Sequence, residues 1–336
     1  MKPNLIIEKA MNQMKLKVLI CCVFITVIFF FATLTKRDNG FKRRLKTLTK
    51  IESREERRKR QIDTVCNASD SQIELTANVL ASIRHHLNHF IFDDKHKLIY
   101  CFVPKVASTN WKRVLLSIDG GIQHFPESDP LSIKGNESQS RNVFKTLDQI
   151  EDSEEVLRRL KQYFKFVFVR NPLERLLSAF RNKFQFAYND YFRERFGRKI
   201  IKQYRVNYTK ASLENASDVT FQEFITYISD LNVSDYRSAF NEHWRPISDL
   251  CFPCLIRFDV IGKYETLEED VFFILWKNHL FNTIRFPQRR ESYSSKPTSE
   301  LIANYYTQLP RDLLTKILTL YENDLNLFHY EVFFDK

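Results

Sequence analysis

Two short apolar runs stand out along the chain, and each is followed at once by a segment with helical spacing. The runs cover residues 98–103 (LIYCFV) and 164–169 (FKFVFV), a length and composition typical of buried strands. After the second run, Leu173, Leu176 and Leu177 recur at the interval of a helix face that packs on a sheet. Repeated strand–loop–helix units predict an α/β fold with three layers around a central parallel sheet.

Further helices are predicted where a glutamate follows a serine or threonine by three positions, the spacing of a capping box. Ser71 and Glu74 have this spacing, and the apolar residues that follow them up to Phe90 fall on one helical face. A helix is therefore expected to open the folded part of the chain. The same spacing recurs at Thr220 with Glu223 and at Thr266 with Glu269.

Val18 to Leu34 is a run without a charged residue. At about 1.5 Å per residue it spans roughly 26 Å as a helix, close to the thickness of an endoplasmic reticulum bilayer. A cleaved signal peptide is the competing interpretation, but the phenylalanines at 29–31 occupy the place of the small residues in a cleavage site. We therefore predict a cytoplasmic tail over residues 1–17 and an uncleaved transmembrane signal anchor over residues 18–35.

The orientation of this anchor depends on two opposing signals. More Lys and Arg follow the anchor than precede it, which by the positive-inside rule favours a cytosolic C-terminal side. However, long C-terminal domains translocate largely regardless of charge, and the four cysteines downstream suit an oxidising lumen. Five N-x-S/T sequons also lie downstream, at Asn67, Asn136, Asn207, Asn215 and Asn232. We predict a single-pass type II membrane protein with a lumenal domain glycosylated at these sequons.

The net charge of +11 comes from the N-terminal arm. Residues 1–17 and 36–60 hold all of the excess positive charge, and residues 61–336 are balanced. A balanced main domain excludes a generally basic nucleic-acid-binding domain, so no nucleic-acid partner is expected. The alternating basic and acidic residues of the arm indicate a solvated stem, with a heparin-type site as the alternative. We assign residues 36–90 to a basic stem and leading helix, and residues 91–336 to the lumenal domain.

The segment after the first strand has the chemistry of an anion site. The chain has six glycines, and none has the spacing of a Rossmann or Walker loop. Instead, residues 104–110 (PKVASTN) place small and hydroxyl-bearing residues at a helix N-terminus, where backbone N–H groups and the helix dipole attract anions. Lys105 adds a full charge. Taken alone, an N-cap beside a surface lysine is an equally good interpretation.

The segment after the second strand repeats this arrangement. Arg170 lies at the tip of the strand, Asn171 is a suitable N-cap, and Pro172 suits the first helical turn. Ser178 lies two turns into the helix and off its apolar face. Ligands of open α/β sheets bind beyond the carboxyl ends of the strands. Two such units predict a ligand that carries phosphate-like groups at two places.

These segments resemble the two donor-binding motifs of Golgi carbohydrate sulfotransferases. The similar stretches are YCFVPKVASTNWKRVL and FVFVRNPLERLLSAF, with a third that runs from NEHWRP through CFPC to FDVIGKYETLEED. The resemblance covers roughly residues 95–336 and is closest to the chondroitin 4-O-sulfotransferase family. It implies a P-loop-like sulfotransferase fold, and it implies a protein that is located in the Golgi membrane. It also implies transfer of a sulfuryl group from 3′-phosphoadenosine 5′-phosphosulfate to a sugar hydroxyl, the 4-O of N-acetylgalactosamine in chondroitin-type glycans.

The resemblance also assigns roles to residues. Residues 104–110 would hold the 5′-phosphosulfate, with Lys105 stabilising the bridging oxygen, whereas Arg170 and Ser178 would hold the 3′-phosphate. Ser108 stands where the family often has Cys, and Asn171 where it often has Asp, and both keep a small polar group. The full set implied to contact the donor is Pro104, Lys105, Val106, Ala107, Ser108, Thr109, Asn110, Arg170, Asn171, Pro172, Leu173, Glu174, Arg175, Leu176, Leu177 and Ser178.

The acceptor hydroxyl needs a base to take its proton. His243 is the candidate, because it lies in the Glu-His-Trp-Arg-Pro turn of the third similar stretch and an ordinary histidine pKa of about 6.5 suits a base. A structural histidine is the alternative for this residue. Glu174 and Asp249 are the other candidate bases.

No metal is expected to take part. Cys251 and Cys254 form a metal-like pair, but Cys66 and Cys101 are too scattered along the chain to complete a convincing zinc site. Disulfides are the better interpretation of these cysteines. Four cysteines allow three pairings, and the sequence leaves all three open.

Two other functions fit parts of the pattern. A phosphotransferase would use the same anion sites, but the chain has neither a Walker Lys-Ser motif nor an evident magnesium carboxylate. A catalytically silent, glycan-binding membrane protein would keep the fold without needing the donor. The expected partners are a glycan acceptor, on a glycosaminoglycan or a glycoprotein, and the membrane.

Overall fold

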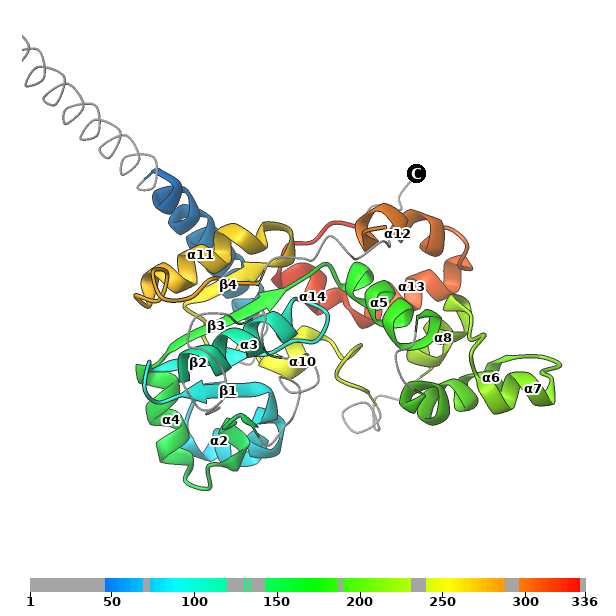
Figure 1. Ribbon diagram of the computed structural model, residues 1–336, viewed down its shortest axis with the longest axis horizontal. Helices are drawn as coiled ribbons and strands as arrows, with labels where there is room; N and C mark the ends of the chain where they lie inside the picture. The colour runs from blue at the N-terminus through cyan, green and yellow to red at the C-terminus, as the bar shows by residue number, and fades with distance from the viewer. Residues whose placement is uncertain are drawn as a thin grey trace, which may run out of the picture. The chain divides into compact units, whose positions relative to one another are not determined.

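A computed structural model describes residues 46–68, 73–119, 130, 133, 143–186, 190–230, 240–287 and 296–332 (Figure 1). The chain divides into two compact units, Met1–Arg54 and Glu55–Lys336. The predicted tail and signal anchor lie outside the described residues, as do the sequons at Asn136 and Asn232. No helix within the described ranges combines the length and the hydropathy needed to cross a bilayer.

A four-stranded sheet forms the centre of the second unit, in the order β1-β2-β3-β4. The strands are β1 (Phe90–Asp93), β2 (Leu98–Cys101), β3 (Phe164–Val169) and β4 (Val260–Lys263). β2, β3 and β4 are parallel, but β1 is antiparallel to β2. The expected all-parallel sheet is therefore wrong at this edge, because the four residues between β1 and β2 allow only a hairpin.

Close packing between neighbouring strands of the sheet requires a glycine at position 262. Gly262 in β4 lies beside Phe168 in β3, and a Cβ atom at residue 262 would come within 2.4 Å of the Phe168 ring. No side chain fits in that space. The glycine thus allows the buried phenylalanine of the central strand to fill the core.

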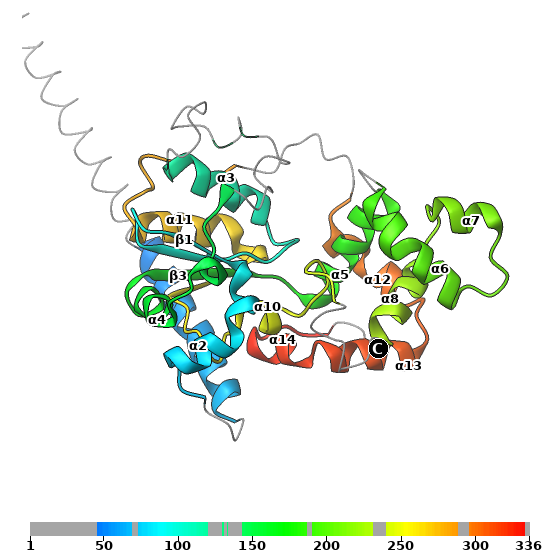
Figure 2. The same cartoon turned by 90° about the horizontal axis from the view of Figure 1, so that it is seen from below.

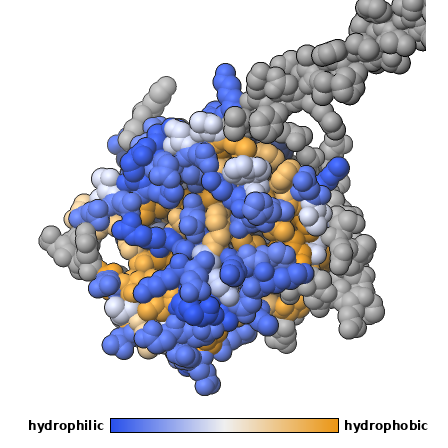
Figure 3. All heavy atoms as spheres, turned by 90° about the vertical axis from the view of Figure 1, so that its left-hand side faces the viewer, coloured by the Kyte–Doolittle hydropathy of each residue, from blue (hydrophilic) through white to orange (hydrophobic). Residues whose placement is uncertain are grey.

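Helices cover both sides of the sheet, as the predicted three-layer arrangement requires. In Figure 2, α3 (Ser108–Asp119) lies on one side, and α2 (Ala77–Ile83) and α4 (Ser153–Gln162) lie on the other. α11 (Leu267–Lys277) packs against β4. Short 3-10 turns occur at η5 (Leu147–Gln149) and η8 (Tyr264–Thr266). The face on the side of α4 and α11 is largely hydrophilic with smaller apolar areas, as expected of a solvated surface (Figure 3).

A second, aromatic-rich core lies among the helices that follow β3. Its buried residues include Phe180, Phe184, Phe224 and Trp244, whose rings contact one another edge-on or at a tilt. Trp244 is fully buried. The helices that enclose this core are α5 (Pro172–Phe180), η6 (Arg181–Gln185), η7 (Arg193–Gly197), α6 (Arg198–Tyr204), α7 (Lys210–Asn215), α8 (Phe221–Ser229), α12 (Thr298–Tyr306) and α13 (Arg311–Leu320). α14 (Glu322–Leu327) follows and packs against α13.

Of the three predicted capping boxes, one is confirmed, one is wrong, and Ser71 of the third lies outside the described residues. Thr220 and Glu223 form the expected reciprocal bonds at the start of α8. The helix expected from Ser71 begins at Ala77 with Thr76 as its N-cap, then tightens into the 3-10 turn η1 (Arg84–His89), and Phe90 belongs to β1. At Thr266 the hydroxyl donates to Asp270 (2.6 Å) instead of capping α11.

The interpretation of the basic arm as a solvated stem does not hold for its last part. Residues 55–67 are helical and lie within the second unit. Glu55 accepts a hydrogen bond from the backbone N–H of Ile261 (2.9 Å), and Arg58 donates to the carbonyl of the same residue (2.9 Å) and to Asp270 (2.8 Å). Ile261 is in the edge strand β4, so the buried Glu55 and the half-buried Arg58 cover the free sheet edge.

Candidate active site

The loop between β2 and α3 has an unusual backbone. Lys105 and Ala107 both have left-handed φ angles, of 74° and 65°. Such angles cost free energy for residues other than glycine and persist where the surroundings hold them. The loop leads into α3, whose Trp111 is buried against Phe166 (ring centroids 4.6 Å apart). The N-terminus of a twelve-residue helix is thereby fixed beyond the carboxyl end of β2, as expected of an anion site.

The loop between β3 and α5 is built as the sequence predicted. The Asn171 side chain accepts hydrogen bonds from the backbone N–H groups of Leu173 (3.0 Å) and Glu174 (3.4 Å), with Pro172 at the first helical position. The Arg170 guanidinium donates to Glu174 (3.0 Å) and to the Lys105 carbonyl (3.3 Å). The two loops are thus in direct contact.

Some residues implied to contact the donor have other structural roles. Leu173, Leu176 and Leu177 lie in the hydrophobic core, so only their backbone is available to a ligand. The Asn110 amide donates to the Pro287 carbonyl (3.0 Å). Ser178 is half-buried on α5, the helix that Arg170 precedes.

Arg175 connects the two loops to the third similar stretch. Its buried guanidinium donates to three carbonyl oxygens, those of Pro104 (3.0 Å), Glu242 (2.7 Å) and Arg245 (2.6 Å). The burial of this arginine could not be predicted from its neighbours in the sequence, because its partners lie about 70 positions away along the chain in both directions. Arg175 is therefore a positioning residue that fixes the loop between β2 and α3 relative to the turn of His243.

Two further contacts hold that turn in place. A disulfide joins Cys101, at the end of β2, to Cys251 in α10 (Ile247–Cys251), and a second joins Cys66 to Cys254. The buried Asp324 carboxylate accepts hydrogen bonds from the backbone N–H groups of Ile247 (2.6 Å) and Ser248 (2.8 Å). The pairing that the sequence left open is thereby settled, and one of the two bridges ties the end of β2 to α10, the helix that follows the turn of His243.

His243 is oriented by its neighbours. Asn241 Oδ1 lies 3.0 Å from the His243 backbone N–H and 2.6 Å from Nδ1. Because an amide oxygen only accepts, Nδ1 carries the proton and Nε2 keeps a lone pair. Burial, and then the charges of Lys183, Lys105 and Arg175, hold the pKa of His243 well below its usual value. The imidazole is therefore neutral near pH 6.5 and able to accept a proton at Nε2.

Four cations lie in or beside the loop between β2 and α3: Lys105, Arg170, Arg175 and Lys183. Burial and the charges of Lys183, Arg170 and Arg175 lower the pKa of Lys105 to about 7. Lys183, in η6, is half-buried beside Lys105 and was not identified from the sequence, because no spacing distinguishes it from an exposed lysine in a helix. Burial is also the main cause that lowers the pKa of Lys183. Desolvation and mutual repulsion make this arrangement of cations unfavourable by itself. It is the arrangement expected of a site that binds a multiply charged anion.

The alternative bases are less available. Glu174 is paired with Arg170 (3.0 Å), and Asp249 lies on α10, past the turn of His243. Within the described residues, no group of three or more His, Cys, Asp or Glu side chains is placed to hold a metal ion. The arrangement brings Lys105, Arg170 and His243 together through Arg175 and Lys183.

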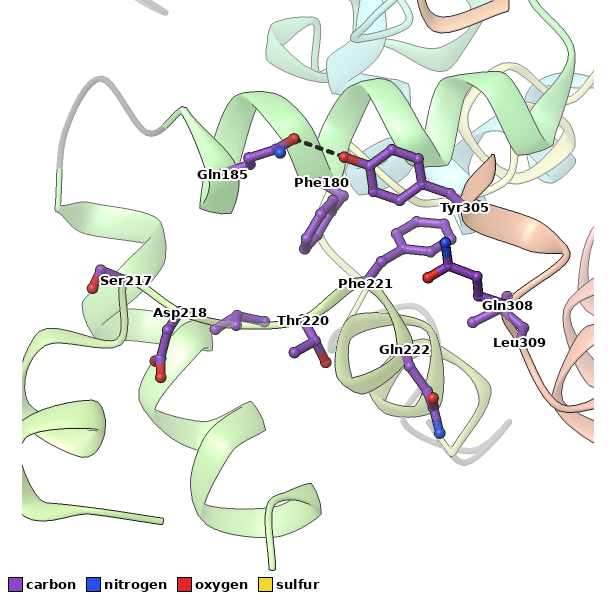
Figure 4. Close-up of a pocket in the computed structure, with 11 residues that line it drawn as sticks. Phe180, Gln185, Ser217, Asp218, Thr220, Phe221, Gln222, Tyr305, Gln308 and Leu309 are labelled. Atoms are coloured by element: carbon purple, nitrogen blue, oxygen red, sulfur yellow. Dashed lines mark hydrogen bonds between the residues drawn. The ribbon is translucent and has the colours of Figure 1, made fainter. Parts of the chain in front are cut away.

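A separate pocket of about 460 Å³ lies at the C-terminal end of α5 (Figure 4). Phe180, Phe221 and Tyr305 provide aromatic rings, and the Tyr305 hydroxyl donates to Gln185 (3.1 Å). None of the residues predicted to bind donor or to act as base lines this pocket. It is therefore distinct from the cluster around Lys105.

Comparisons with known proteins agree with this site. The model of the sulfotransferase family matches residues 88–331, which include both loops and the turn of His243. Carbohydrate sulfotransferase 11 of Rattus norvegicus is 36% identical over 99% of this chain and 98% of its own length. Carbohydrate sulfotransferase 14 of Danio rerio is 37% identical over 84% of this chain and 74% of its own. No solved structure gives a significant match. The chain belongs to the sulfotransferase family.

Proposed function

We propose that this sulfotransferase transfers the sulfuryl group of 3′-phosphoadenosine 5′-phosphosulfate to a sugar hydroxyl. The acceptor that we propose is the 4-O of N-acetylgalactosamine in a chondroitin-type glycan. The observation that carries this proposal is the cluster of Lys105, Arg170, Arg175 and Lys183 around two helix N-termini. The carbohydrate sulfotransferases that the chain resembles support the choice of a sugar acceptor.

The two loops divide the donor between them. The phosphosulfate supplies the sulfuryl group, and the first loop with Lys105 binds this end through its charge and the N-terminus of α3. Lys105 stabilises the negative charge that grows on the bridging oxygen as the S–O bond breaks. Arg170 and Ser178 bind the 3′-phosphate, which does not react. Residues 104–110 and 170–178 form the donor site in this proposal.

His243 takes the acceptor proton. As the new bond forms between the sugar oxygen and sulfur, the hydroxyl proton moves to His243 Nε2, and the donor leaves as 3′-phosphoadenosine 5′-phosphate. Asn241 supports this role because it holds Nδ1 protonated and directs the lone pair of Nε2. The cations and the base account for the reaction without a resident metal.

The protein is also proposed to be a type II protein of the Golgi membrane, anchored by residues 18–35. The two disulfides support an oxidising lumen for the second unit. The sequons described by the structure, Asn67, Asn207 and Asn215, are all exposed, which glycosylation requires. Glycosidase treatment of the cell-expressed protein should increase its gel mobility, and an unchanged band would contradict the lumenal assignment.

The experiment that tests the function combines binding and transfer. Purified protein should bind 3′-phosphoadenosine 5′-phosphate and should transfer labelled sulfate to desulfated chondroitin in preference to dermatan or N-glycan acceptors. Binding without transfer to any glycan would favour the catalytically silent alternative. Transfer to N-glycans alone would keep the enzyme class and overturn the proposed acceptor.

A further inference from the structure

A helical segment next to the site exposes positive charge on one side. In η7 and α6, the exposed residues Arg195, Arg198, Lys199 and Lys202 lie on the outer face, and this set is called the basic helix face. The inner face is apolar and buried, and its residues are Phe196, Ile200 and Ile201. Gly197 allows the close approach on that side, because a Cβ there would meet Ala216 at 3.0 Å.

Within the part of the chain that the structure describes, no carboxylate neutralises the charges of the basic helix face. Elsewhere in the described residues, helical arginines pair with carboxylates, such as Arg158 with Glu155 (2.7 Å) and Arg159 with Asp94 (2.9 Å). Among those same residues, none of the four forms an ion pair: Arg198 donates to the Glu214 carbonyl, and Lys199 lies over the Tyr227 ring. Since residues 61–336 are balanced in charge overall, this face carries a local excess of positive charge.

The segment starts at the proposed acceptor site. Phe192 directly precedes η7, and its ring contacts His243 edge-on, with centroids 5.2 Å apart. Lys183 lies over the same phenylalanine ring, 4.3 Å from its centroid. From Phe192 to Lys202 a helix advances about 15 Å, so the segment leads from the turn of His243 through α6 toward α7 (Figure 1).

We propose that the basic helix face is an exosite for an anionic, polymeric glycan. This inference rests on the proposed function, and it specifies a polymer with carboxylates repeated along its length as the acceptor. With one sugar hydroxyl at His243, the neighbouring uronate carboxylates lie along Arg195, Arg198, Lys199 and Lys202. Arginine binds carboxylates through bidentate hydrogen bonds. A row of positive charges also raises the local concentration of a polyanion. A short neutral glycan has no carboxylates to pair with this face, so the face does not raise its affinity.

The test uses the full-length protein in detergent and a matched pair of variants. The exosite variant carries Arg195→Gln, Arg198→Gln, Lys199→Gln and Lys202→Gln. The control removes the same charge elsewhere, from the exposed residues Lys95, Lys161, Arg311 and Lys316, each replaced by Gln. Glutamine keeps a long side chain and a good helix propensity, so both variants should fold.

The expected result is specific to the polymer. The exosite variant should raise the KM for desulfated chondroitin about tenfold or more, while its kcat and its KM for a chondroitin tetrasaccharide stay within about twofold of wild type. Added NaCl should raise the polymer KM of the wild type and of the control, but barely that of the exosite variant. An unchanged polymer KM, or an equal loss in the control, overturns the exosite.

A second measurement separates this inference from the proposed function. If the wild type sulfates neither polymer nor tetrasaccharide, the proposed function fails, and retention on immobilised chondroitin then decides the exosite. Retention of the wild type and the control, with loss of the exosite variant, supports it. Retention that all three proteins share, or preferential binding to phosphatidylserine vesicles, overturns it.

Discussion

The two strand tips of the site each carry a cation, but the surroundings of the two cations are opposite. Lys105 follows β2, and burial, together with the positive charges of its neighbours Lys183, Arg170 and Arg175, lowers its pKa to about 7. Arg170 follows β3 and already has a carboxylate partner, Glu174, at 3.0 Å and an aromatic ring, Tyr264, at 4.2 Å. The positive charge of Lys105 is therefore repelled by its neighbours, whereas the positive charge of Arg170 is stabilised by its neighbours.

This difference indicates a division of work between the loops. A cation without a counter-ion is stabilised most when an anion binds beside it. The stabilisation is greatest where negative charge grows during the reaction. A cation that is fixed in place by a carboxylate and a ring loses little entropy when it binds a phosphate. Lys105 is therefore suited to the bond that breaks, and Arg170 to the phosphate that does not react.

The largest effect is expected at the residue that neither loop provides. His243→Asn keeps the size and some hydrogen bonding of the side chain but removes the basic nitrogen, so kcat should fall about 10²–10⁴-fold. The affinity for 3′-phosphoadenosine 5′-phosphate should not change, because both donor loops remain. Single-turnover kinetics and calorimetry measure the two quantities. A variant within a few-fold of the wild-type rate would disprove this role, and Glu174 and Asp249 would be tested next.

Lys105→Ala should affect the chemical step. Loss of one preorganised charge at a developing anion typically costs about 10²–10³ in kcat. We expect this loss at saturating donor, with a smaller change in product affinity. Lys161→Ala, which removes an exposed lysine on α4, is the control. If Lys105→Ala weakened binding alone and left kcat intact, the two loops would not differ in the proposed way.

The parts that the sequence predicted are those determined by residues close together along the chain. β3, the Asn171 cap and the Pro172 start of α5 lie within ten consecutive positions, and the structure contains them as expected. The antiparallel β1 and the late start of α2 were missed, because the pattern of a short helix followed by a strand resembles one longer helix.

The parts that were not predicted depend on contacts between distant segments. Arg175 reaches carbonyls on both sides of it along the chain, and Glu55 pairs with a strand 206 positions later. Neither residue differs in type or spacing from an exposed one. Lys183 and the two disulfide pairings belong to the same class, because only the fold brings their partners together.

Arg170→Ala should change binding more than catalysis. A hydrogen bond to a charged group contributes about 1.5–3 kcal/mol, so the Kd for 3′-phosphoadenosine 5′-phosphate should rise roughly 10–150-fold. At saturating donor, kcat should remain near that of the wild type. Arg257→Ala removes an exposed arginine that pairs with Asp63 and is the matched control. A loss of kcat with unchanged donor affinity would reverse the roles assigned to the loops.

The smallest effect is a pH dependence that separates the two cations. Below pH of about 7, Lys105 is charged both with and without ligand, so product affinity should not change with pH on its account. Above that pH the free lysine loses its proton, and a bound anion must restore it, so affinity should fall by up to about tenfold per pH unit. Calorimetric titrations between about pH 6 and 9 would show this fall in the wild type and not in Lys105→Ala. In Arg170→Ala the fall should begin at a higher pH, because the charge of Arg170 is one of the causes that lower the pKa of Lys105. An equal slope in wild type and Lys105→Ala would mean that the cation at the first strand tip is not held against repulsion, and the contrast between the two loops would be lost.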